Sequence, residues 1–318
     1  MSELKSLTLA ECCDRLEKMD NIKVLMHVRP DGDTVGSSAA LCLILSQMGK
    51  DVTYDCGEPI PERLRFLLSG IEKKPAAGRT AVAVDVASTG QLGSLCDEKV
   101  ALTIDHHEVS TPFSDNYTVG GMSSAGEVIY LVAEELCRRG RLTMTREIAE
   151  RIYAAMSSDT GGFTFSNANA ETYRVAGELI ALGVDHAKIN HKLFYSKSFS
   201  ALKAEGFIAE KLKTAAGGKI SYATLSRAER EALGIPFSDF ECAIDVVRSL
   251  LGAEVCFVVR ETDLGELKVS LRSTGADVAS LARLHNGGGH IRAAGCTVKA
   301  GSPNEAAEIL IEDIKKII

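Results

Sequence analysis

The stretch MHVRPDGDTVGSS, residues 26–38, contains the junction that decides the fold. It follows an apolar run and precedes a helical pattern, so it marks the point where a strand ends and a helix begins. Within seven residues it holds one imidazole and two carboxylates, His27, Asp31 and Asp33. An Asp-Gly turn and a helix cap explain the two acids if each is considered alone. A functional explanation requires that other strands end in the same way.

Short apolar runs alternate with helical patterns throughout the N-terminal half of the chain. Two of the runs are almost continuously apolar, which is typical of strands buried on both faces of a parallel sheet. This alternation predicts an α/β domain with a doubly wound, mostly parallel sheet. The strands are expected at 22–28, 51–55, 80–86 and 100–104. The helices are expected at 34–48, 61–69, 123–139, 143–158 and 170–195.

The pattern changes near residue 196, where a helical stretch runs into a Gly-Gly turn. We expect a catalytic domain over 1–195, a linker helix over 196–217 and a smaller C-terminal α/β domain over 218–318, with the active-site cleft between the domains. The second domain is expected to contain strands at 219–224, 254–261 and 267–272 and helices at 226–233, 238–251, 277–285 and 303–318, with a glycine run before the last helix.

Length and charge limit the classes of protein that this chain can belong to. A single core rarely grows beyond about 250–300 residues, so a chain of 318 residues favours two domains. The net charge of −7 argues against a binder of long nucleic acids, because such proteins usually present a basic field to phosphates. A short anionic ligand or a metal site built from carboxylates is compatible with this charge.

Cysteine usage and hydropathy indicate the compartment. The nine cysteines are an odd number without a CxxC pair, which predicts reduced thiols and no disulfide framework. The N-terminus is amphipathic and charged, unlike a signal peptide, and no apolar run approaches the roughly 18 residues that a membrane span needs. We therefore expect a cytoplasmic protein without a membrane partner, and its apolar helix faces permit a homodimer.

Acids and imidazoles also follow other strands. Asp85 ends one apolar run, and Asp105-His106-His107 ends the next. Because ligands gather beyond the carboxyl ends of the strands in an open parallel sheet, these side chains are expected at one edge with those of the opening stretch. Asp159 follows a predicted helix, where the helix dipole disfavours an acid unless a cation is present.

A shared countercharge explains this crowding better than separate caps and turns do. Each acid or imidazole alone has a structural explanation, but together they would repel one another and lose hydration. Four carboxylates with two imidazoles and no thiolate favour Mn²⁺ over a structural zinc, with Mg²⁺ or Co²⁺ as substitutes. Two ions about 3.5–4 Å apart with a bridging carboxylate are typical of phosphate-ester hydrolysis.

These motifs resemble those of the DHH phosphoesterases in order and spacing. The N-terminal motifs are HVRPDGDTVGS at 27–37, Asp85, DHH at 105–107 and DTGGF at 159–163. SLRS at 270–273 and GGGH at 287–290 resemble the DHH-associated C-terminal domain. The resemblance covers nearly the whole chain. It is strongest with the short nanoRNase A type, which combines an oligoribonuclease with a 3′-phosphoadenosine 5′-phosphate (pAp) phosphatase.

The resemblance implies two metal ions with one shared ligand. The first ion would be held by His27, Asp31 and Asp85. The second would be held by Asp33, Asp85, His106 and Asp159. It also implies catalytic roles for the bridging Asp85 and for His107, which would contact the substrate phosphate or donate a proton to the leaving oxygen.

The resemblance places the substrate contacts in the second domain, at Arg272, Gly288, Gly289 and His290. An arginine fork suits a phosphate because it donates two parallel hydrogen bonds, and glycines allow close backbone approach to phosphate oxygens. The alternatives are a solvated strand arginine and a flexible turn. The stretch TFSN at 164–167 is either part of the cleft floor or a plain loop.

The expected activity is hydrolysis of oligoribonucleotides of two to five nucleotides to mononucleotides, and of pAp to AMP. One alternative is an inorganic pyrophosphatase of family II, although the C-terminal end lacks a Lys/Arg-rich signature. Others are a phosphodiesterase for linear dinucleotides (pGpG or pApA), a processive exonuclease of the RecJ kind, and a non-catalytic nucleotide sensor. A sensor would tolerate lost ligands, whereas every ligand position here is filled.

Overall fold

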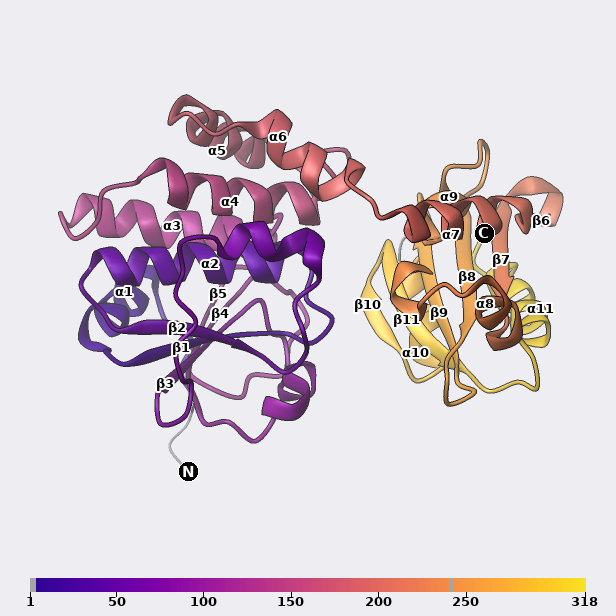
Figure 1. Cartoon of the computed structure of the whole chain (residues 1–318), viewed down its shortest axis with the longest axis horizontal. Helices are drawn as coiled ribbons and strands as arrows, with labels where there is room; N and C mark the ends of the chain where they lie inside the picture. The colour runs from indigo at the N-terminus through magenta and orange to yellow at the C-terminus, as the bar shows by residue number, and fades with distance from the viewer. Residues whose placement is uncertain (1–3, 241–242) are drawn as a thin grey trace. The chain divides into compact units, whose positions relative to one another are not determined.

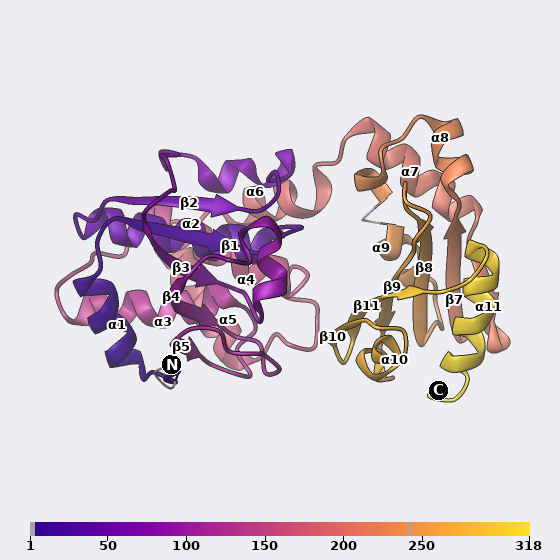
Figure 2. The same ribbon diagram turned by 90° about the horizontal axis from the view of Figure 1, so that it is seen from below.

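The computed structural model describes residues 4–240 and 243–318, which form two compact units (Figures 1 and 2). The first unit ends at Ser196 and the second begins at Lys197. Each unit contains its own sheet and its own hydrophobic core. This is the predicted α/β architecture with a larger N-terminal and a smaller C-terminal part.

The sheet of the first unit has the strand order β2-β1-β3-β4-β5, and its described strand pairs are all parallel. This order reverses between β1 and β3, so the sheet is doubly wound as predicted. The last strand is only three residues long and was not predicted. The strands are β1 (Ile22–Met26), β2 (Val52–Cys56), β3 (Thr80–Val84), β4 (Val100–Asp105) and β5 (Asn116–Thr118).

Helices α1 to α4 share the main core of the first unit with one face of its sheet (Figure 1). The opposite face is covered by the short helix η2 and loops around residues such as Leu92 and Phe113. The expected helix at 61–69 is a 3₁₀ helix, and the one at 170–195 divides into three pieces. The elements are α1 (Leu9–Lys18), α2 (Gly32–Gln47), η1 (Glu62–Leu68), η2 (Thr89–Leu95), α3 (Ala125–Arg138), α4 (Arg146–Asp159), α5 (Ala170–Ala181), α6 (His186–Asn190) and the π-helical η3 (His191–Tyr195).

Glycines let α2 and α3 approach α4 closely. A Cβ atom on Gly36 of α2 would lie 2.8 Å from the carbonyl oxygen of Arg151. A Cβ atom on Gly126 of α3 would lie 2.5 Å from the Cβ of Ala155. Backbone-to-backbone contact of this kind sets the distance between the helix ends that bear the acids, because larger side chains would separate the helices.

The second unit has a mixed sheet with the order β10-β11-β9-β8-β7-β6. Strands β7 and β8 pair in parallel, and the other described pairs are antiparallel. The glycine run forms strand β10 instead of a loop, and β6, β10 and β11 were not predicted. The strands are β6 (Lys213–Ala215), β7 (Ile220–Leu225), β8 (Val255–Glu261), β9 (Leu267–Ser273), β10 (Gly288–His290) and β11 (Ala293–Val298).

Helices cover both faces of this sheet. Helices α10 and α11 pack in one core cluster, and α7 and α9 pack in another. The expected linker helix corresponds to α7, whose Ala204 and Ile208 are buried in the second unit's core. Residues 241–242 of the expected helix 238–251 lie outside the described residues. The elements are α7 (Phe199–Glu210), η4 (Ala216–Gly218), α8 (Arg227–Leu233), η5 (Phe237–Phe240), α9 (Ala243–Arg248), α10 (Val278–Leu284) and α11 (Pro303–Ile314).

Within residues 4–240 and 243–318, no helix combines the length and apolar character required to cross a bilayer.

Candidate functional site

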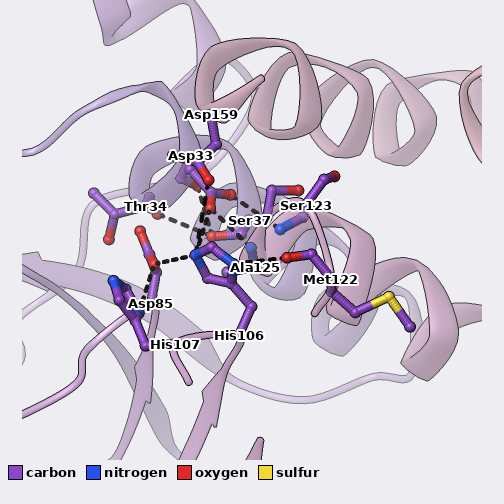
Figure 3. A network of polar contacts seen from close by, with 12 residues as sticks. Asp33, Thr34, Ser37, Asp85, His106, His107, Met122, Ser123, Ala125 and Asp159 are labelled. Carbon is purple, nitrogen blue, oxygen red and sulfur yellow. Dashed lines mark hydrogen bonds and ion pairs between the residues drawn. The ribbon is translucent and has the colours of Figure 1, made fainter. Parts of the chain in front are cut away.

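Three neighbouring strands deliver acids and imidazoles to the carboxyl edge of the first sheet. His27 follows β1, Asp85 follows β3, and the His106-His107 pair follows β4. The edge between β1 and β3 is the point where the strand order reverses, which is where open α/β sheets bind their ligands. The predicted convergence of these side chains is therefore present in the structure. Figure 3 shows Asp85 beside His106 and His107.

Asp85 lies at the centre of the cluster. Its Oδ2 is 3.4 Å from Nε2 of His27, and its Oδ1 is 3.6 Å from Nε2 of His106. The side chain is buried, and the backbone φ of 61° lies in the left-handed region that non-glycine residues seldom adopt. Each carboxylate oxygen thus faces a different imidazole, as a bridging ligand would.

The other acids form two groups around these imidazoles. His27, Asp31 and Asp85 offer ligand atoms that all lie within 4.8 Å of one another, and so do Asp33, His106 and Asp159. A third such group combines Asp85 with both histidines of the DHH triplet. All six metal ligands expected from the sequence are thereby brought together, although Asp31 is exposed.

The imidazoles of both candidate ligands, His27 and His106, are oriented by backbone carbonyls. Nδ1 of His27 lies 2.9 Å from the oxygen of Val28. Nδ1 of His106 lies 3.1 Å from the oxygen of Met122 (Figure 3). A neutral ring that donates from Nδ1 presents an unprotonated Nε2, and in both rings Nε2 faces the carboxylates. This arrangement is typical of metal-bound histidines, whose second nitrogen is fixed by an outer hydrogen bond.

The acids of the cluster are electrostatically unfavourable without a countercharge. Burial, reinforced by Asp85 and Asp159, raises the pKa of Asp33 well above its usual value. Burial and the neighbouring Asp31 likewise raise the pKa of Asp85, and they raise that of Asp159 to about 7. A cation among these oxygens would remove the repulsion.

The donor set fits divalent metal ions. It consists of carboxylate oxygens and imidazole nitrogens without a thiolate, which suits Mn²⁺ and related ions. The Nε2 atoms lie 3.4–3.9 Å from the carboxylate oxygens, which exceeds an ordinary hydrogen bond. Ligand atoms that share an ion at about 2.1 Å each are roughly 3–3.5 Å apart, so small side-chain shifts would close the shell.

Hydrogen bonds from helix starts fix two of the acids. Oδ1 of Asp31 accepts from the backbone amides of Asp33 and Thr34, so Asp31 is the N-cap of α2 as well as a candidate ligand. Asp33 accepts from the amides of Ala125 and Gly126, at 2.8 and 3.0 Å, at the start of α3. Asp31 is therefore the N-cap of α2, and it also belongs to a group of residues that could hold a metal ion.

His107 differs from His27 and His106 because the partner of its Nδ1 is a carboxylate. Its Nδ1 lies 2.7 Å from Oδ1 of Asp105, which is almost fully buried. Burial opposes a charge on this ring, but the hydrogen bond and charge of Asp105 prevail and raise the pKa of His107 to about 9. His107 is thereby suited to contact a phosphate or to donate a proton.

Sequence reasoning assigned no role to several supporting residues. Asp105 orients His107, although only its place in the DHH triplet could have suggested this. The Thr34 hydroxyl accepts from the His27 amide and donates to the Val84 carbonyl, which ties the ends of β1 and β3 together. No local pattern could reveal this contact, because residues 34 and 84 meet only in the folded sheet.

The predicted substrate contacts lie in the second unit. Arg272 of β9 is opposite Ala293 of β11, which is opposite His290 of β10. Directly paired residues share a face, so Arg272 and His290 project from the same face with Cα atoms about 10 Å apart. Gly288 and Gly289 are exposed on the same edge strand.

The fold and the cluster of candidate metal ligands are features of a protein family that sequence comparison identifies. Residues 21–156 match the DHH family, N-terminal domain, and residues 217–318 match the DHHA1 domain. The chain belongs to the DHH family, and the resemblance seen in its motifs is confirmed.

Two relatives are similar over almost their whole length. The chain is 31% identical to the bifunctional oligoribonuclease and PAP phosphatase NrnA of Thermus thermophilus, with 93% of this chain and 89% of the relative covered. It is 30% identical to the protein of the same name from Bacillus subtilis, with 92% and 93% covered.

Solved structures with the same fold include two informative examples. An exopolyphosphatase-related protein from Bacteroides fragilis is 26% identical, with a TM-score of 0.85 over 97% of this chain and 96% of that one. RecJ of Thermus thermophilus in complex with Mn²⁺ is 17% identical, with a TM-score of 0.56 over 99% of this chain and 56% of RecJ. The second likeness concerns the fold alone.

Proposed function

We propose that this protein is a manganese-dependent phosphoesterase that cleaves very short oligoribonucleotides and removes a phosphate from pAp. Relatives about 30% identical over more than 90% of the chain are named bifunctional oligoribonuclease and PAP phosphatase. The products would be mononucleotides and AMP. A cytoplasmic location is part of the same proposal, because such substrates arise where RNA is degraded.

The position of Asp85 is the observation that supports this proposal most strongly. Its two oxygens face the Nε2 atoms of two imidazoles, each of which belongs to a separate group of ligands. Two ions that share one carboxylate form the arrangement used for displacement at phosphorus. We propose His27, Asp31 and Asp85 for one ion, and Asp33, Asp85, His106 and Asp159 for the other.

The protein's own groups would divide the remaining tasks. When bound, the two ions would activate a water for attack on phosphorus and neutralise the phosphate charge. His107, held by Asp105, would donate a hydrogen bond to the phosphate or a proton to the leaving oxygen. Asp85 would fix the distance between the two proposed ions, because it belongs to both proposed ligand sets.

The second unit would select the substrate. Arg272 and His290 project from one sheet face, and we propose that they bind a terminal phosphate with the amides of Gly288 and Gly289. The net charge of −7 argues against an extended basic track for a long strand. Substrates of two to five nucleotides are therefore expected to be preferred.

A rate panel with Mn²⁺ tests the proposed function. It compares a diribonucleotide, a pentaribonucleotide, pAp, pyrophosphate and a labelled 30-mer under identical conditions. We expect turnover of the first three and little hydrolysis of the last two. Asp85→Asn and His106→Ala should abolish turnover of all three substrates.

Other outcomes would redirect the assignment. Preferred release of phosphate from pyrophosphate would indicate a pyrophosphatase, and processive digestion of the 30-mer would indicate an exonuclease of the RecJ kind. Turnover restricted to pGpG or pApA would indicate a linear-dinucleotide phosphodiesterase. Tight nucleotide binding without turnover would indicate a sensor.

A further inference from the structure

One peptide bond connects a candidate metal ligand to a buried acid. The carbonyl oxygen of Met122 lies 3.1 Å from Nδ1 of His106. The amide of the same peptide unit, on Ser123, donates to Oε2 of Glu127 at 2.8 Å. The path therefore runs from the imidazole through a single peptide group to a carboxyl group that does not contact the ligand cluster directly.

Burial and hydrogen bonds hold the Glu127 side chain in this position. Its side chain is 1% exposed, and Oε2 also accepts from the hydroxyls of Ser123 at 2.6 Å and of Thr172 at 3.3 Å. Its Oε1 has no hydrogen-bond partner among the described residues. The carboxyl group is thus turned so that all three donors meet one oxygen.

A helix cap does not explain this geometry. In α1 and α8, Glu11 and Glu229 at the third helical position return to the backbone amide of their own N-cap residue. Glu127 occupies the equivalent position in α3, whose N-cap is Ser124. It reaches one residue further instead, to the amide whose carbonyl partner binds His106.

The turn that Glu127 holds also supports two other candidate ligands. The amides of Ala125 and Gly126 donate to Asp33. The side-chain amide of Asn167 donates to the carbonyls of Ser123 and Asp159, at 3.0 and 3.1 Å. The segment around residues 122–126 thus touches or braces Asp33, His106 and Asp159, all expected on the same ion.

We propose that Glu127 is a positioning residue for the ion held by Asp33, His106 and Asp159, acting on His106 through the Met122–Ser123 peptide. A carboxylate that accepts from a peptide N–H polarises the group, so its carbonyl becomes a better acceptor for the imidazole Nδ1–H. The ring is then held in the tautomer with an unprotonated Nε2, and the lone pair of Nε2 becomes a stronger electron-pair donor to a metal ion. In carboxylate–histidine–metal triads the carboxylate orients the ring directly and raises its basicity. Here a peptide group relays the same effect.

Mn²⁺ binding by the full-length protein tests the proposal without reference to turnover. The variants are Glu127→Ala, which removes the acceptor, Glu127→Gln, which keeps a neutral acceptor, and Val132→Ala. Val132 is a buried residue of the same helix far from the turn, so it reports general core damage. Calorimetry measures Mn²⁺ affinity, and melting in EDTA measures the stability of the metal-free fold.

We expect Glu127→Ala to weaken one Mn²⁺ binding step about 10–100-fold, the usual effect of losing an outer-shell partner. Glu127→Gln should show a smaller loss, since hydrogen bonds to a charged acceptor are about twice as strong as neutral ones. Val132→Ala should lower the melting temperature without changing affinity. If Glu127→Ala does not fold, Glu127→Gln decides: weaker Mn²⁺ binding at a near-normal melting temperature supports the proposal.

Unchanged affinity in a folded Glu127→Ala protein would overturn the proposal, and so would equal losses in Glu127→Ala and Val132→Ala. If Glu127→Ala fails to fold, normal affinity in Glu127→Gln would also overturn it. The inference rests on the proposed metal site. Failure of the wild-type protein to bind Mn²⁺ would refute that site, whereas wild-type binding with unaffected variants would refute only the role of Glu127.

Discussion

Asp85 combines a rare backbone conformation with an unfavourable charge. Asp85 follows directly after β3 and has a φ of 61°. Its side chain is buried between two imidazoles. Such strained positions concentrate at functional sites, where the surrounding structure maintains them. Asparagine tolerates the same backbone region, so Asp85→Asn removes the charge and leaves the conformation in place.

Asp85→Asn is expected to separate activity from stability. Turnover should fall at least about 100-fold, because the carboxylate that we propose as the bridging ligand is lost. The metal-free protein should become about 0.5–2 kcal/mol more stable, since burial and Asp31 disfavour the ionised form of Asp85 and raise its pKa. Rates with pAp and melting in EDTA measure the two effects.

Asp97→Asn is the matched control, because Asp97 is exposed and outside the ligand groups. It should change neither quantity. A metal-free Asp85→Asn protein that melts below the wild type would contradict the electrostatic argument.

At the scale of elements, close helix contacts determine where the acids meet. Helix α4 ends at Asp159, and α2 begins one residue before Asp33. The glycines of α2 and α3 against α4 keep these helix ends close together, since a Cβ atom at either position would clash. Spacing of the ligands therefore depends on residues that bear no functional group.

Gly36→Ala and Gly177→Ala should have opposite effects on stability. Alanine is favoured over glycine inside a helix by about 1 kcal/mol. At Gly36 a Cβ would meet the Arg151 carbonyl at 2.8 Å, so we expect a net loss of about 1–3 kcal/mol. At Gly177 of α5 nothing lies within 4 Å, so we expect a gain of about 0.5–1 kcal/mol.

Urea unfolding of the two variants measures both values. Gly36→Ala should also weaken Mn²⁺ binding, because α2 is displaced from α4. Equal stability changes in the two variants would show that helix propensity alone determines the result.

The long, strongly patterned elements could be predicted from the sequence, and the weakly patterned ones could not. Strands β1, β3 and β4 are apolar runs buried on both faces, so composition alone indicates them. Strands β10 and β11 occupy the glycine- and alanine-rich segment GGHIRAAGCTV, whose residues disfavour strands in isolation. They form because β11 can pair with β9, and β10 can then pair with β11, which is a tertiary effect.

The candidate ligands could be predicted for a similar reason. A strand end is visible in the sequence, and parallel strands bring their ends to one edge. The roles of Asp105 and Glu127 could not be predicted, because each depends on a contact whose partner is fixed only by folding. Ser-x-x-Glu at 124–127 even suggests an ordinary capping box, which the structure does not contain.

For the whole molecule, the metal-free protein should lose stability as the pH rises from about 5.5 to 8. The folded-state pKa values of Asp33, Asp85 and Asp159 are raised, the last to about 7, so the folded state binds more protons than the unfolded state. Stability therefore falls as these acids ionise. The raised pKa of His107 acts in the same direction, since between pH 6.5 and about 9 the folded state keeps a proton that the unfolded state releases.

Mn²⁺ should reverse this trend, because it binds the ionised form. At a concentration 100 times Kd, each site should add about 2.7 kcal/mol. Melting at pH 5.5 and 8, in EDTA and in Mn²⁺, measures the effect. A metal-free protein that is more stable at pH 8 would refute the electrostatic account of the cluster.

The second unit should fold alone if it begins at residue 197 and be weaker if it begins at 218. Its two core clusters contain only residues of the second unit. The shorter piece lacks Ala204 and Ile208, which are buried against residues of β7, and it also lacks β6. We expect it to be at least about 2 kcal/mol less stable in urea. Equal urea midpoints would show that α7 is a linker, as the sequence suggested.

Separate cores have a consequence for descent. Among the described residues, the clusters beneath the two sheets share no member, so each sheet can accumulate substitutions without disturbing the packing of the other. A lineage can therefore keep the same hydrolytic chemistry while its range of nucleotide substrates diversifies.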